Sequence, residues 1–179
     1  MNTQQRILLL PGWQNSDPGH WQSLWEQEFG YERVEQADWD WPRRGDWMAR
    51  LDEVLLADPR PALLVAHSLG CQLVASWAAH SSLTHRVLGA LLVAPPDTEA
   101  QDMPPQLHNW RPIRRQGLPF PTITVVSSDD PFCAHERGAQ MSADWGSRLV
   151  EAGPLGHLNT ASGLGDWPTG QALLAGLRE

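Results

Sequence analysis

The chain has 179 residues, of which 41% are hydrophobic and 19% are charged, and its formal net charge is −8. This length suits one domain with one hydrophobic core, and the composition excludes a disordered acidic chain and a coiled coil. Because the net charge is negative and no basic stripe is present, we expect neither nucleic acid nor an anionic membrane surface as a partner. We therefore predict a single domain over residues 1–179.

The two cysteines and the N-terminal segment indicate the compartment. Cys71 and Cys133 lie far apart and form no disulfide framework, so we expect two buried thiols in a reducing compartment. The first apolar run, Ile7–Leu10, follows a polar start and stops at Pro11 and Gly12. It is too short for a signal-peptide core or a membrane span, so we expect a cytoplasmic protein.

Short apolar runs alternate with longer segments of helical periodicity. In chain order we predict a strand at Arg6–Leu10, a helix at Gly19–Phe29, a weak strand at Arg33–Ala37, a helix at Asp46–Ala57 that Asp46 caps, a strand at Ala62–Ala66, a helix at Leu69–Ala79, strands at Val87–Ala94 and Thr122–Ser127, a helix at Ala134–Ala143, a strand at Arg148–Glu151 and a helix at Thr169–Leu177. Apolar strands separated by helices indicate a doubly wound parallel sheet, covered on both faces. Ligands bind such sheets at the carboxyl ends of the strands.

A serine stands at the end of the strand Ala62–Ala66. Ser68 lies between this strand and the next helix, with the small residues Ala66 and Gly70 on either side. This arrangement resembles G-x-S-x-G, the nucleophile elbow of α/β-hydrolases, in which strand and helix approach closely. The alternative is that Ser68 only caps the helix. The strand and helix on its two sides favour a nucleophile.

A serine nucleophile needs a base, and His157 is the best placed of the histidines. It follows the strand Arg148–Glu151, at the same sheet edge as the serine, and comes last in the chain order Ser, acid, His. We expect His67, next to the serine, to point away from it. The other histidines are expected to be surface or loop residues: His20, His80, His85, His108 and His135.

Two aspartates compete for the acid that orients the histidine. Asp129 and Asp130 both follow the strand Thr122–Ser127. Asp130 precedes Pro131, whose fixed φ helps to define the turn, and the acid of hydrolases commonly stands before such a proline. We favour Asp130, which would leave Asp129 to cap the turn.

Acyl transfer also needs an oxyanion hole made of preorganised N–H groups. One donor would be the backbone N–H of Leu69, directly after the serine. The second should come from the loop after the first strand, where Gly12 permits a bend and the N–H of Trp13 is the best candidate. Gln14 is the alternative.

The chain resembles the small bacterial and animal serine hydrolases related to the retinoblastoma-binding serine hydrolase, an α/β-hydrolase family. The matching blocks, spread over nearly the whole chain, are Pro11-Gly12-Trp13-Gln14, Gly19-His20-Trp21-Gln22, Trp25-Glu26, Asp38-Trp39, Pro42, Trp47, His67-Ser68-Leu69-Gly70, Ser128-Asp129-Asp130-Pro131-Phe132, Gly156-His157-Leu158-Asn159 and Ser162-Gly163-Leu164-Gly165-Asp166-Trp167-Pro168. The family's Ser, Asp and His map to Ser68, Asp130 and His157. Ala66, in place of the usual glycine, is the one departure at the elbow.

We therefore predict a compact α/β-hydrolase with about six parallel strands in the order 2-1-3-4-5-6, helices on both faces and at most a minimal cap. The cap or loop would be segment 97–119. Its arginines, Arg111, Arg114 and Arg115, would either recognise an acidic substrate group or lie in solvent. Six of the ten tryptophans fall within residues 13–47, and we expect Trp13 and Trp167 to line one wall of the site.

The predicted reaction is hydrolysis of a small ester, thioester or amide through an acyl-serine intermediate. We expect no cofactor and no metal, because dinucleotide, P-loop and zinc motifs are missing from the sequence. The alternative is a protein-binding module that keeps the fold with a weak or vestigial triad. An occluded serine or a histidine turned away from it would favour that alternative.

Overall fold

The computed structural model describes residues 4–179; Met1–Thr3, the polar start of the chain, lie outside the described residues. Its elements, in chain order, are β1 (Arg6–Leu10), α1 (Trp21–Phe29), β2 (Glu32–Arg33), α2 (Arg44–Ala57), β3 (Ala62–His67), α3 (Leu69–Ala78), η1 (Thr84–Arg86), β4 (Val87–Val93), η2 (Pro105–Trp110), β5 (Thr122–Val126), α4 (His135–Asp144), β6 (Arg148–Glu151), η3 (Thr160–Ser162) and α5 (Pro168–Gly176).

The described strands form one six-stranded sheet in the order β2-β1-β3-β4-β5-β6, and each neighbouring pair is parallel. This confirms the predicted doubly wound sheet and its strand order. The central strands are apolar on both faces because helices cover both.

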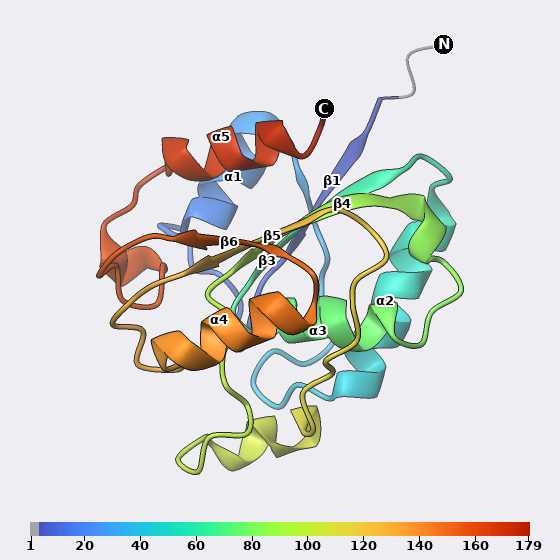
Figure 1. The fold of residues 1–179 in the computed structure, drawn as a ribbon. Coiled ribbons are helices and arrows are strands. Elements are labelled where there is room, and N and C mark those ends of the chain that lie inside the picture. The colour runs from blue at the N-terminus through green and yellow to red at the C-terminus, as the bar shows by residue number, and fades with distance from the viewer. Residues whose placement is uncertain (1–3) are drawn as a thin grey trace.

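Two hydrophobic clusters lie on opposite faces of the sheet. One contains side chains of α2, α3 and α4, such as Trp47, Leu73 and Met141. The other contains Trp21 and Trp25 of α1 and residues of α5. Figure 1 shows α1 and α5 on one side of the strands and α2, α3 and α4 on the other.

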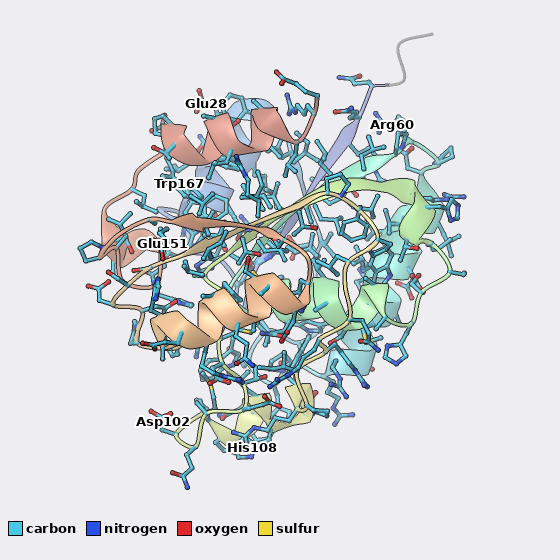
Figure 2. All side chains as sticks on the ribbon, in the orientation of Figure 1. Glu28, Arg60, Asp102, His108, Glu151 and Trp167 are labelled. Atoms are coloured by element: carbon cyan, nitrogen blue, oxygen red, sulfur yellow. The ribbon has the colours of Figure 1, made fainter. Side chains whose placement is uncertain are left out.

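Segment 97–119 projects beyond the carboxyl ends of the strands and contains the short helix η2 (Figure 1). Its apolar side chains Met103, Leu107, Trp110 and Ile113 are buried in the same cluster as α2 and α3. His108 and Asp102 lie at its outer edge (Figure 2). The segment is therefore a short, packed cover over one part of the sheet edge.

Candidate active site

Ser68 occupies a sharp turn between β3 and α3. Its backbone has φ 53° and ψ −124°, a region that non-glycine residues rarely adopt. Its N–H donates to the Val93 carbonyl (2.9 Å), and its carbonyl accepts from the Cys71 N–H (2.8 Å). The side chain is half-buried, so its hydroxyl is held at the sheet edge without being occluded.

Two glycines let the neighbouring backbone approach this turn. A Cβ at Gly12 would lie 2.8 Å from the Cβ of Ser68 and 3.0 Å from the Leu69 nitrogen. A Cβ at Gly70 would collide with the Leu10 carbonyl of β1. Ala66, at the position where the family pattern has glycine, fits with its side chain fully buried.

The three predicted residues meet at the ends of β3, β5 and β6. The Ser68 Oγ lies 2.8 Å from the His157 Nε2. The His157 Nδ1 lies 2.9 Å and 3.0 Å from the two carboxylate oxygens of Asp130. The imidazole is therefore hydrogen-bonded at both nitrogens, and the histidine is not turned away from the serine.

Asp129 has different partners from Asp130. Its Oδ1 accepts hydrogen bonds from the Gly156 N–H (2.8 Å) and the Ser127 hydroxyl (2.9 Å), and these bonds lower the pKa of its carboxyl. The Ser127 Oγ in turn accepts the Leu155 N–H (3.0 Å). Asp129 therefore ties the turn after β5 to the loop that carries His157.

The His67 side chain contacts the backbone of His157 and points away from Ser68, as expected. Its Nε2 lies 2.9 Å from the backbone carbonyl of His157, and the two ring centroids are 4.9 Å apart. Burial holds the pKa of His67 well below its usual value. The neutral ring therefore donates to that carbonyl and supports the His157 backbone.

The backbone amides of the first loop distinguish between the two candidates for the second oxyanion donor. The Gln14 N–H donates to the Trp39 carbonyl (2.9 Å). Within residues 4–179 the Trp13 N–H has no such acceptor. Leu69 is the first residue of α3, where an N–H has no acceptor inside the helix. Among the described residues, Trp13 and Leu69 therefore each keep an N–H without an acceptor near Ser68.

A cavity of about 310 Å³ opens beside the serine. Its lining combines apolar and polar residues, namely Gly12, Trp13, Gln14, Asn15, Asp17, His20, His67, Ser68, Leu69, Pro96, Leu107, Phe132, His157 and Asn159. Leu107 belongs to η2, so segment 97–119 contributes to the wall. A larger hollow, of about 660 Å³, lies around β2 and the start of β1, away from these residues.

The structure places two side chains differently from what the sequence suggested. His20, expected to be a surface or loop residue, lies in the loop before α1 but is 3% exposed and lines the cavity, where it caps α1 by accepting the Gln22 N–H. Trp167 does not line the cavity; it packs against Trp21 and Trp25 beneath α5 (Figure 2). The position of His20 before the helix that begins at Trp21 was the available signal for a cap, but nothing in the sequence indicated its burial.

The two cysteines and the arginines of segment 97–119 do not belong to the site around Ser68. Both cysteines are buried, and burial raises the pKa of Cys71 well above its usual value and that of Cys133 to about 12, so neither is an activated thiol. Arg111 donates to the carbonyls of Thr98 and Ala100, and Arg115 pairs with Glu99. Neither of these arginines, nor Arg114, is among the cavity-lining residues.

A parallel sheet with a serine on a strained turn, next to a histidine and a carboxylate, has the architecture of an α/β-hydrolase. The family model for serine hydrolases matches residues 7–176, and the chain belongs to this serine hydrolase family. It is therefore a hydrolase. No curated protein shows a significant match to the sequence.

Solved structures show the same fold. A YdeN-like hydrolase from Pectobacterium atrosepticum is 29% identical, with a TM-score of 0.86 over 97% of this chain and 90% of that one. The ydeN gene product of Bacillus subtilis is 18% identical, with a TM-score of 0.75 over 97% and 98%. The esterase RhEst1 from Rhodococcus is 15% identical, with a TM-score of 0.68 over 99% and 92%. Within residues 4–179, no helix is long and apolar enough to cross a membrane.

Proposed function

We propose that this hydrolase cleaves small esters, thioesters or amides through an acyl-Ser68 intermediate. The observation that carries the proposal is the unbroken hydrogen-bonded line from Asp130 through His157 to the Ser68 hydroxyl. An occluded serine or a displaced histidine would have favoured a protein-binding module, and neither is found.

The geometry supports a defined role for each group. With its Nδ1–H donated to Asp130, His157 presents the lone pair of Nε2 to the Ser68 hydroxyl and takes its proton as the oxygen attacks the acyl carbon. The Trp13 and Leu69 N–H groups stabilise the developing oxyanion. His157 then gives the proton to the leaving group, and water, activated by the same imidazole, releases the acid and restores Ser68.

The cavity supports a small acyl substrate. Its volume of about 310 Å³ lies at the lower end of the range of about 300–1,000 Å³ that is usual for ligand sites. The negative net charge and the absence of arginine from the cavity lining disfavour an anionic partner. A neutral acyl compound in the cytoplasm is the proposed substrate.

A fluorophosphonate probe tests the proposal. The wild-type protein should be labelled at Ser68, and Ser68→Ala should lose labelling together with at least about 10⁴-fold of turnover on p-nitrophenyl butyrate. Ser82→Ala, which changes an exposed serine, is the matched control and should behave as wild type. Full activity of Ser68→Ala would overturn the proposal.

A further inference from the structure

A hollow of about 410 Å³, which we call the outer hollow, adjoins the cavity that contains Ser68. Phe132, His157 and Asn159 line both spaces, so these three residues form the edge at which the two meet. Ser68 and Leu107 line only the cavity. The outer hollow is therefore an extension of the site around Ser68, and it lies on the side of His157.

The surface of the outer hollow is mainly apolar. Apart from the shared edge, its apolar lining comes from Pro131, Pro154, Leu155 and Ala161. The Ser162 hydroxyl also lies there, but it donates to the Leu155 carbonyl (2.6 Å) and accepts the Asn159 N–H (3.1 Å). Among the described residues that line the outer hollow, none is an aspartate, a glutamate or an arginine. Such a surface favours an uncharged, apolar group.

The Phe132 ring provides accessible apolar surface at the shared edge. It is 37% exposed, and its centroid lies 4.6 Å from that of the His157 ring. Covering such a ring with an apolar part of the substrate removes apolar surface from water on both partners.

The proposed reaction assigns a direction to each substituent of the acyl carbon. Once the Ser68 Oγ has attacked, this carbon also carries the oxyanion, the acyl chain and the leaving group. The oxyanion faces the N–H groups of Trp13 and Leu69. The leaving-group oxygen must lie within hydrogen-bond distance of the His157 Nε2 to take its proton. The leaving group therefore extends on the His157 side, where the outer hollow begins, and the side of Leu107 remains for the acyl chain.

We propose that the outer hollow binds the leaving group of the substrate and that this leaving group is a bulky, uncharged, apolar alcohol. The inference rests on the proposed function, because the proton that His157 gives to the leaving group fixes where that group lies. The substrate class is then an ester of a short-chain acid, held in the cavity, with a cyclic, branched or aromatic alcohol, held in the outer hollow.

The test compares two butyrate esters whose alcohols differ in size. Methyl butyrate and cyclohexylmethyl butyrate give the same butyryl-enzyme, and their two alcohols have similar acidity. Their ratio of kcat/KM therefore reports how the leaving group is bound during acylation. The wild type should prefer the cyclohexylmethyl ester by at least about tenfold, because its ring buries apolar surface in the outer hollow. A ratio near one would overturn the inference.

A charge placed in the outer hollow should remove this preference. Ala161 is exposed and lines the outer hollow but not the cavity, so Ala161→Asp adds a carboxylate there without disturbing the core. An apolar ring would then have to displace water from that carboxylate, and the ratio should fall to about one. Ala172→Asp adds the same charge at an exposed position of α5 outside both spaces, and this matched control should keep the wild-type ratio. A wild-type ratio in Ala161→Asp would contradict the inference.

Leu155→Ala provides a second variant, which removes apolar surface from the outer hollow without adding charge. The ratio should fall about threefold or more, and an unchanged ratio would count against the inference. A loss of folded protein would slow both esters equally and leave the ratio unchanged. If neither ester were cleaved and Ser68 took no fluorophosphonate probe, the proposed function itself would fail. Cleavage of both esters with equal kcat/KM would refute the role of the outer hollow alone.

Discussion

The Ser68 backbone has a positive φ, which costs of the order of 1–3 kcal/mol for a non-glycine residue. The surrounding chain holds it there through the Val93 carbonyl and through the close approach of Gly12 and Gly70. The strain lifts the hydroxyl from the strand end toward His157. At this residue the sequence was informative, because the two small neighbours and the serine already indicate a sharp turn.

Asp130 and Asp129 are adjacent residues with different hydrogen-bond partners, and a matched pair of substitutions tests the separate tasks that we propose for them. Asp130→Asn should lower turnover by about 10⁴-fold, because the amide favours the wrong tautomer of His157. Asp129→Asn keeps an acceptor oxygen for the Gly156 N–H, so its turnover should fall by less than about tenfold. Steady-state kcat of the two variants measures the difference, and the reverse order would contradict the assignment.

Some residue-scale expectations depended on contacts that no sequence pattern reports. The burial of His20 results from the way α1 packs beside His67. The two candidates for the second oxyanion donor, Trp13 and Gln14, differ because the Gln14 N–H donates to the carbonyl of Trp39, a residue that is distant in sequence. The position of Trp167 likewise depends on its packing against Trp21 and Trp25, which are distant in sequence.

At the scale of elements, η2 connects segment 97–119 to the cavity. We expect the acyl chain of the substrate to lie against Leu107 in the cavity. Leu107→Ala should then enlarge the space for this chain and shift the preferred p-nitrophenyl ester from short chains toward longer ones. The loss of buried side chain should lower the free energy of unfolding by about 2–5 kcal/mol. Met103→Ala is the matched control, because Met103 is buried in the same segment but is not a lining residue. An unchanged chain-length profile in Leu107→Ala would show that η2 does not form the acyl wall.

The element boundaries show where local signals suffice. The four long apolar runs were predicted within one residue, because burial on both faces makes them apolar throughout. The edge strand β2 covers only Glu32–Arg33 instead of Arg33–Ala37, because pairing with β1 decides its length. The helix α2 begins at Arg44, so Asp46 lies in its first turn instead of capping it.

For the whole molecule, the buried histidines predict a dependence of stability on pH. The pKa of His20 is about 4 in the folded chain and 6.5 at its ordinary value, so between these the unfolded chain binds more protons. The contribution of His20, of the order of 3 kcal/mol, is therefore complete above pH 6.5 and is lost as the pH falls toward 4. His67 acts in the same direction.

Urea unfolding measures this dependence. The midpoint should fall between pH 7 and pH 5, and it should fall less in His20→Asn, which has no group to protonate there. His85→Asn, at an exposed position, is the control and should keep the wild-type slope. A midpoint that is independent of pH in this window would contradict the burial of neutral histidines.

The whole-molecule architecture was predictable because strand order, chirality and chain order constrain one another. A parallel doubly wound sheet brings the residues after β3, β5 and β6 to one edge, so the sequence alone could bring Ser68, Asp130 and His157 together. The make-up of the cavity was not predictable, since its walls come from η2, the turn between β3 and α3, and the loops after β1, β4, β5 and β6, whose packing depends on long-range contacts.

We propose that Ser68 becomes acylated during turnover. Acid quenching of the enzyme with p-nitrophenyl butyrate, followed by intact-mass and peptide-mass measurement, tests it most directly. We expect a mass increase of one butyryl group on the peptide that contains Ser68, and no increase in Ser68→Ala. Two results would contradict this proposal. The acyl group could be found on a residue other than Ser68, or Ser68→Ala could hydrolyse the ester at the wild-type rate with no acyl group on either protein.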